Sequence, residues 1–367
     1  MVELIANVNN AINGFVWGVP MLVLLVGTGI LMTILTKFFQ LSHIGHWFKN
    51  TVGGIFHDQH VTKHTDADDQ SISQFQSLCT ALAATIGTGN IVGVASALVA
   101  GGPGAIFWMW IVAFFGMMTN YSENVLGIYY RRKNFKGEWS GGAMYYLKDG
   151  LGSYKGCKQI GAVLAVLFSA FCLLASFGIG NMSQVNSIAA NMTSAFSIPA
   201  TVTGIVLVII GALVIVGGLK CIAAVTEKLV PFMAIAYVIG ALVIFFANIG
   251  HVGAVFTAIF KGAFGLRSVG GGIVGSGVKL ALTWGMKRGV FSNEAGLGSS
   301  VMVHSSSNVK EPVRQGMWGI FEVFADTMVV CTLTAFAVLS SGLIDLDTGA
   351  VLVDVSGSAL VGQAFAT

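Results

Sequence analysis

Residues 84–93 read A-T-I-G-T-G-N-I-V-G, and they lie at the centre of an uncharged segment, 72–100, that is long enough to cross a bilayer. The glycines weaken a helix at this point, and the hydroxyl and amide groups between them are polar. Irregular backbone at membrane depth is tolerated where protein buries it or where it lines a cavity. The stretch therefore predicts a membrane helix that is unwound at its centre and lines a binding cavity. A glycine kink that serves only helix packing is the alternative.

The composition of the whole chain agrees with a membrane location. Of its 367 residues, 55% are hydrophobic and only 10% are charged, which excludes a soluble globular domain and indicates an all-α polytopic membrane protein surrounded by lipid. A net charge of +3 is too small to indicate nucleic-acid binding. We find no nucleophile–base arrangement and no phosphate-binding loop, so we expect neither an enzyme nor an organic cofactor.

Hydropathy predicts eight membrane segments, joined by polar loops. The first loop, 37–71, opens with an amphipathic stretch that we expect on the membrane surface. With the N-terminus outside, loops on the inside carry fourteen of the nineteen Lys and Arg residues, and outside loops carry two. This asymmetry predicts a multi-pass protein of the cell (cytoplasmic or inner) membrane in that orientation. The segments are 15–36, 72–100, 105–130, 159–182, 199–219, 228–248, 272–303 and 312–339.

Two of these segments resemble each other. N-I-V-G at 90–93 matches N-E-A-G at 293–296, and in both a serine, a proline and a tryptophan-containing helix follow in the same order. Five segments separate the two starts, so the copies must have opposite orientation. Inverted repeats with discontinuous helices are a mark of secondary transporters, although glycine-rich helices also align by chance. The match predicts a second break at 289–293.

Four motifs extend the match to a known family. The residues 80–95, 139–147 (W-S-G-G-A-M-Y-Y-L), 180–189 (G-N-M-S-Q-V-N-S-I-A) and 287–299 (K-R-G-V-F-S-N-E-A-G-L-G-S) resemble the sodium:alanine symporter family. The resemblance implies an amino-acid/cation symporter for alanine, glycine or glutamine. It also implies a leucine-transporter-like fold of five plus five inverted helices after one extra N-terminal helix.

This fold divides the chain into three parts. Residues 1–71 form the extra transmembrane helix and the amphipathic cytoplasmic loop, 72–250 form the first five-helix repeat, and 251–367 begin the inverted second repeat. Only two helices of the second repeat are present, so we expect either a fragment of a longer protein or a truncated product. In this fold the third helix of the second repeat normally completes one of the sodium sites.

The resemblance also assigns roles at the first break. The carbonyls of Thr85 and Ile86 and the side chain of Asn90 are the expected sodium ligands, and hard oxygen donors suit that ion. The backbone amides of the next three residues are expected to bind the substrate carboxylate. These residues are Gly87, Thr88 and Gly89.

Further site residues are expected on two other segments. At the second break, Phe291 would close over a small apolar side chain, and its neighbours would offer polar contacts; the residues are Gly289, Phe291, Ser292 and Asn293. In the fourth segment, Phe177 would set the pocket size, while Asn181 and Gln184 would hydrogen-bond the substrate. Interhelical hydrogen bonds are an equal alternative for these polar side chains.

Several charged residues fall within membrane segments. Lone charges in lipid are expensive, so we expect Arg288 or Lys287 to pair with an acidic side chain, either as a gate or as a fixed ion pair. Glu322 and Asp326 are four residues apart and so lie on one face of the eighth segment. The residues assigned to this role are Arg288, Glu294, Glu322 and Asp326.

Taken together, the sequence predicts a transporter that imports a small neutral amino acid with sodium by alternating access. A truncated scaffold without transport activity and a proton-coupled amino-acid transporter are the alternatives. An ion channel is disfavoured because no pore loop is repeated, and a membrane-embedded enzyme lacks catalytic residues.

Overall fold

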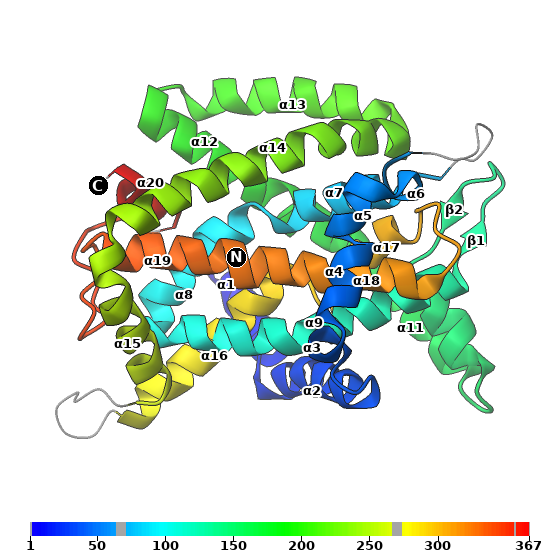
Figure 1. Cartoon of the computed structure of the whole chain (residues 1–367), viewed down its shortest axis with the longest axis horizontal. Coiled ribbons are helices and arrows are strands. Elements are labelled where there is room, and N and C mark those ends of the chain that lie inside the picture. Colours follow the sequence, from blue (N-terminus) through cyan, green and yellow to red (C-terminus); the bar gives the residue numbers. More distant parts are fainter. Residues whose placement is uncertain (1, 64–70, 266–273, 356, 367) are drawn as a thin grey trace.

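The computed structural model describes residues 2–63, 71–265, 274–355 and 357–366, and most of them are helical (Figure 1). The N-terminal part contains α1 (Val2–Val16), α2 (Val19–Leu35), α3 (Phe39–Ser42), α4 (Ile44–Asn50), α5 (Val52–His57) and α6 (Gln59–Thr62). The next part contains α7 (Gln74–Thr85), the π-helical η1 (Gly89–Gly93), α8 (Val94–Gly101), α9 (Gly104–Tyr130), the two-stranded hairpin of β1 (Arg132–Lys133) and β2 (Trp139–Ser140), α10 (Ala143–Tyr145), η2 (Tyr146–Gly150) and η3 (Leu151–Ser153).

The second half of the chain continues in the same way. It contains α11 (Lys158–Phe177), η4 (Gly178–Met182), α12 (Ser183–Phe196), α13 (Ala200–Val216), α14 (Gly218–Ala247), η5 (Ile249–His251) and α15 (Val252–Ala263). It ends with α16 (Val274–Asn293), α17 (Ser300–His304), α18 (Pro312–Val323), the π-helical η6 (Phe324–Cys331), α19 (Thr332–Ser340) and α20 (Ser358–Ala366).

The helices divide into an inner and an outer set. Helix α9 contacts α2, α15, α16 and α18, and its sequence is mostly buried (Figure 1). By contrast, α11, α13 and α14 expose most of their leucine, valine, isoleucine and phenylalanine side chains. In water such a surface would be costly, but in a bilayer these side chains face hydrocarbon. The outer set therefore forms the lipid-facing surface around a packed interior.

Among the described residues, five helices are long and apolar enough to cross a membrane. These are Ala6–Leu35, Gly104–Tyr130, Lys158–Phe196, Gly218–Ala247 and Pro312–Ser340, and the bent pair of α7 with η1–α8 would make a sixth. The predicted fifth segment corresponds to the shorter α13, and the predicted seventh corresponds to α16 and α17. The count of eight remains a prediction.

The predicted break in the second segment is present. Helix α7 begins with a reciprocal cap, in which the Ser73 hydroxyl accepts the Gln76 amide at 3.0 Å and the Gln76 side chain accepts the Ser73 amide at 3.1 Å. It ends at Thr85 because Ile86 is extended (φ −79°, ψ 97°), and the chain re-enters a helix at Gly89 with a bend of 44°. The polar centre of the segment is therefore where the helix stops.

The second break lies downstream of the predicted position. Helix α16 runs through Gly289 and ends at Asn293, so the expected break at 289–293 is corrected to 294–299. The Asn293 side chain accepts the Ala295 amide at 3.1 Å, which ends the helix by offering its backbone an alternative partner. Glu294, Gly296 and Gly298 then adopt φ values of 56°, 90° and 72°, which turn the chain sharply.

The two broken helices are packed crosswise. Helix α7 contacts α17, whereas η1 and α8 contact α16, so each half of one broken helix lies against the opposite half of the other. A parallel β-bridge between Ile72 and Ser307 joins the residues just before α7 to those just after α17. This arrangement agrees with an inverted pair, while the complete leucine-transporter-like repeat and the three-part division remain predictions.

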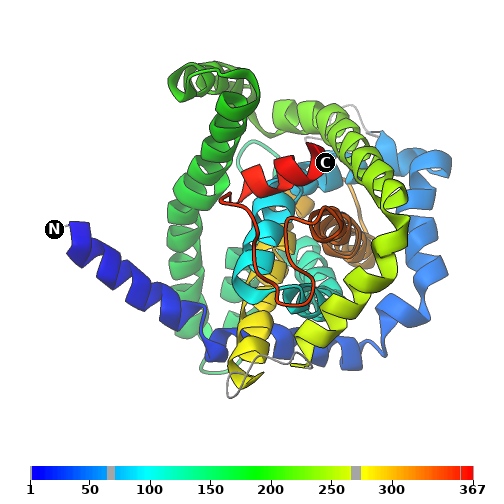
Figure 2. The ribbon, with the colours of Figure 1, turned by 90° about the vertical axis from the view of Figure 1, so that its left-hand side faces the viewer.

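Segments near both ends of the chain pack against the helix bundle. Trp47 in the first loop is buried and packs against Phe324, so this part of the amphipathic stretch lies on the protein core and not on the membrane surface. Near the other end of the chain, α20 buries Leu360 and Val361 and contacts η1, α8 and α19. Figure 2 shows α20 over the helix bundle and α1 extending away from it.

Candidate functional site

A buried carboxylate lies where the two broken helices meet. Asp326, in the π-helical η6, accepts a hydrogen bond from the Asn90 amide at 2.5 Å and another from the Ser292 hydroxyl at 2.8 Å. Asn90 belongs to the first broken helix and Ser292 to the second. The Thr327 hydroxyl donates a third hydrogen bond at 2.7 Å. Asp326 therefore joins three separate segments of the chain at one point.

The surroundings of Asp326 are neutral. Asp326 and Asn90 are at most 1% exposed, and the donors that reach the carboxylate are uncharged amide and hydroxyl groups. Among the described residues, no Lys, Arg or His forms an ion pair with it. A buried anion without a cationic partner is costly. The arrangement can therefore bind a monovalent cation, with the carboxylate, amide and hydroxyl oxygens as hard ligands.

The first break holds its own backbone in place. The Asn90 side-chain oxygen accepts the Gly87 amide at 2.8 Å, so this amide is not free for a ligand and its predicted role is withdrawn. Thr88 and Gly89 stand at the start of η1, where the first amides of a helix have no partner within that helix. The anion-binding amides of this break are therefore reduced to those of Thr88 and Gly89.

The end of α7 offers oxygen atoms. Thr85 is 1% exposed, and its hydroxyl has no hydrogen-bond partner among the described residues. The last carbonyls of a helix, here those of Thr85 and Ile86, lack partners within the helix and carry its negative dipole end. These groups can complete a cation shell or accept hydrogen bonds from a ligand.

A cavity of about 440 Å³ lies beside the first break. Thr88 and Gly89 line it, and the Gln184 side chain closes it near Gly87, where an added Cβ would lie 3.3 Å from the Gln184 oxygen. Phe168, Phe171, Phe291, Glu294 and Ser299 line it as well. Phe177 and Asn181 do not line it, and both are exposed, with Phe177 61% exposed, so they are removed from the candidate site.

The predicted residues of the second break take different positions. Phe291 lines the cavity, and Ser292 contacts Asp326. Asn293 points toward η6 instead and donates to the Thr327 hydroxyl at 3.1 Å. Gly289 is in ordinary contact with α9, where an added Cβ would meet Val112 at 3.5 Å, and it lines no part of the cavity.

Arg288 forms none of the expected ion pairs within the described part of the chain. Its guanidinium lies over the rings of Trp284 and Phe291, at 5.3 and 5.5 Å from their centres. Cation–π contact therefore replaces the predicted carboxylate partner. Both acids already have other partners: Asp326 is bound by neutral groups, and Glu322 contacts His304 and Asn120.

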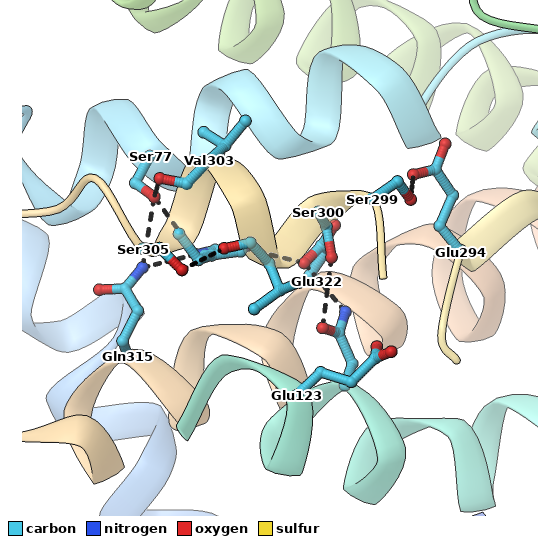
Figure 3. Close-up of polar contacts among 12 residues, drawn as sticks. Ser77, Glu123, Glu294, Ser299, Ser300, Val303, Ser305, Gln315 and Glu322 are labelled. Carbon is cyan, nitrogen blue, oxygen red and sulfur yellow. Dashed lines mark hydrogen bonds and ion pairs between the residues drawn. The ribbon is translucent and has the colours of Figure 1, made fainter. Parts of the chain in front are cut away.

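Glu322 belongs to a second buried network, which sequence reasoning missed. Its carboxylate contacts His304 Nε2 at 3.1 Å and accepts from the Asn120 amide at 3.0 Å (Figure 3). The Gln315 amide contacts His304 Nδ1 at 2.5 Å, and the Ser77 hydroxyl lies 3.3 Å from the same nitrogen. His304 and Glu322 are fully buried. This network ties α17 to α7, α9 and α18.

The loop of the second break is held by two other carboxylates. Glu123 of α9 accepts the Gly296 amide at 3.1 Å, and Glu294 accepts the Ser299 hydroxyl. Figure 3 shows Glu294 apart from Glu322, with its carboxylate toward the end of the helix that carries Ser77. Glu294 is therefore placed on the cavity side of the loop, whereas Glu123 supports the loop from α9.

Gly89 makes a close approach between the two broken helices. A Cβ at this position would lie 3.0 Å from the Ser292 Cα and 3.2 Å from its hydroxyl oxygen. We expect Gly89→Ala to lower the melting temperature, because over-packing of a rigid contact costs about 1–3 kcal/mol. Gly93→Ala is the matched control: it brings the same gain in helix propensity, and its nearest contact would be 3.8 Å away. Equal melting temperatures would contradict the close packing.

Comparison with known proteins identifies relatives along the whole chain. The family model described as "Sodium:alanine symporter family" matches residues 2–367. The chain is 45% identical over 357 residues to the sodium/alanine symporter AgcS of Methanococcus maripaludis, covering 97% of this chain and 74% of the relative. It is 39% identical over 333 residues to the putative sodium/proton-dependent alanine carrier protein YrbD of Bacillus subtilis, covering 91% and 64%. It is 35% identical over 342 residues to the probable sodium/glutamine symporter GlnT of the same organism, covering 93% and 67%.

Proposed function

Because the chain belongs to the sodium:alanine symporter family, we propose that it imports a small neutral amino acid together with sodium by alternating access. Alanine and glycine are the proposed substrates, with glutamine as a further candidate. The names of the relatives support sodium-coupled transport of amino acids. The proposed location is the cell membrane, with the N-terminus outside.

The observation that carries this proposal is the Asp326 carboxylate between the two broken helices. A sodium ion at this point would neutralise the buried charge and replace the neutral donors from Asn90 and Ser292. Rotation of these two side chains would turn their oxygen atoms toward the ion. The carbonyls of Thr85 and Ile86 are further ligands at the negative end of α7.

The substrate would occupy the cavity beside this ion site. Its carboxylate would accept hydrogen bonds from the Thr88 and Gly89 amides at the positive end of η1. Phe291 and the aromatic side chains of α11 surround the remaining volume and exclude water, which favours a small apolar side chain. Gln184 would provide a neutral hydrogen-bonding group near the break.

Ion and substrate are coupled because they share the same broken helices. Sodium bound to Asp326, with Asn90 and Ser292 as further ligands, would hold the two breaks in the geometry that forms the cavity. By thermodynamic linkage, bound substrate then tightens sodium binding by the same factor. A tenfold sodium gradient supplies about 1.4 kcal/mol per ion, and a 100 mV potential adds about 2.3 kcal/mol.

Uptake by proteoliposomes tests the proposal. We expect radiolabelled alanine to accumulate when an inward sodium gradient is imposed, and not when potassium replaces sodium. Uptake that follows a pH gradient without sodium would favour the proton-coupled alternative. If neither sodium nor alanine, glycine or glutamine changes the melting temperature of the purified chain, the non-transporting scaffold would replace this proposal.

A further inference from the structure

The cavity beside the first break contains one charged group. Among the described residues that line it, Glu294 is the only one with a charged side chain, and the others are apolar, aromatic or neutral polar groups. A single carboxylate in a largely apolar cavity produces a strong local field, because little water screens it. The cavity therefore favours a ligand with a positive group.

The protein provides no cation for this carboxylate within the described ranges. No Lys, Arg or His lies within ion-pair distance of Glu294. Arg288, the nearest candidate in the sequence, lies over Trp284 and Phe291. The partner that the structure gives Glu294 is the neutral Ser299 hydroxyl. Within the described ranges, the Glu294 carboxylate therefore faces the cavity with a neutral hydroxyl as its hydrogen-bond donor.

The backbone holds Glu294 in an uncommon conformation. Its φ of 56° lies in the left-handed region, which costs a residue with a Cβ free energy relative to glycine. The adjacent helix end and the hydrogen bond from the Gly296 amide to Glu123 fix the loop on either side. The Ser299 hydroxyl then orients the carboxylate itself. A strained residue held in this way at a cavity indicates a binding role.

At the break in the first broken helix, the C-terminal end of α7 carries a partial negative charge and the N-terminal end of η1 carries a partial positive charge. Helix α7 ends at the cavity, so its carbonyls reinforce the negative charge of Glu294, while η1 begins there and presents amides. In Figure 3 the Glu294 carboxylate lies toward that end of α7. A zwitterion is complementary to both groups, with its carboxylate at the amides of Thr88 and Gly89 and its ammonium at Glu294 and the end of α7.

We infer that the Glu294 carboxylate binds the ammonium group of the transported amino acid. This inference rests on the proposed function and adds the second half of substrate recognition to it. It explains how the cavity distinguishes an α-amino acid from a carboxylic acid of the same size. The acid without the ammonium group would place two negative charges in the cavity and leave Glu294 unpaired.

The test compares alanine with propionate, which lacks only the ammonium group, in the wild type and in Glu294→Gln. Binding is measured by competition against radiolabelled alanine in saturating sodium. We expect the wild type to prefer alanine by about 30-fold or more, as for other buried charge pairs. In Glu294→Gln, which keeps the shape of the side chain, this preference should fall to a few-fold. A preference that remains unchanged, even with weaker alanine binding, would overturn the inference.

Two controls separate this role from a structural one. Glu123→Gln changes a carboxylate that supports the same loop but keeps an oxygen for the Gly296 amide, so the alanine preference should remain. Sodium should still raise the melting temperature of Glu294→Gln, since Asp326 is intact. Equal loss of preference in both variants would assign the effect to the loop. Absence of sodium or alanine binding in the wild type would overturn the proposed function together with this inference.

Discussion

Asp326→Asn is expected to abolish the stabilisation of this protein by sodium. The substitution keeps the shape of the side chain and removes the negative charge that Asn90 and Ser292 contact. A ligand at 100 times its dissociation constant stabilises the folded state by about 2.7 kcal/mol, and this increment should disappear. The measurement is the melting temperature in detergent as sodium replaces potassium at constant ionic strength.

The expected effect on the protein without sodium is small. Asparagine removes a buried charge that has only neutral partners, and it can still accept hydrogen bonds through its oxygen. The melting temperature in potassium alone should therefore be unchanged or higher. Glu322→Gln is the matched control, because it neutralises another buried carboxylate one turn earlier in the same helix, and it should retain the response to sodium.

A sodium response that persists in Asp326→Asn would move the ion site away from this carboxylate. The carbonyls of Thr85 and Ile86 would then be the main sodium ligands. Asp326 would no longer explain how sodium binding couples the two broken helices. Loss of the sodium response in both Asp326→Asn and Glu322→Gln would instead indicate that either substitution disturbs the shared helix and abolishes sodium binding indirectly.

The first break could be predicted because its cause is local. Gly87, Gly89 and Asn90 weaken the helix and offer an alternative hydrogen bond within a few residues, and the Asn90 side chain does bind the Gly87 amide. The second break was predicted too early because Gly289 does not interrupt the helix but serves packing against α9. The better signal was the pair Gly296 and Gly298, whose left-handed conformations turn the chain.

The contacts of the charged residues could not be predicted, since they join distant parts of the chain. Asp326 and Asn90 are 236 positions apart, and only the packing of η6 against η1 brings them together. Glu322 and His304 are only 18 positions apart, but they come from different helices whose packing brings them together. Sequence reasoning identified the buried acids but assigned them to Arg288. Their neutral partners depend on the rotation of each helix, which hydropathy does not specify.

His304→Ala is expected to destabilise the protein by about 3–5 kcal/mol, since it leaves Glu322 buried with fewer partners. His304 and Glu322 are both fully buried, and Glu322 has one oxygen without a partner among the described residues already. Removal of His304 Nε2 leaves the Asn120 amide as the remaining contact of the other oxygen. The measurement is reversible unfolding in mixed detergent micelles, with the sodium concentration held constant.

The double variant shows whether the cost comes from the unpaired charge. In His304→Leu/Glu322→Leu both partners become apolar, and replacing a whole buried pair in this way is often close to neutral. We therefore expect the double variant to be more stable than His304→Ala, although it changes more atoms. If the double variant is less stable than the wild type by the sum of the separate effects of His304→Leu and Glu322→Leu, then packing volume dominates and the pair contributes little specific interaction. In that case α17 would be held to α7 and α9 chiefly by apolar packing, and the polar network would be incidental to the position of the second broken helix.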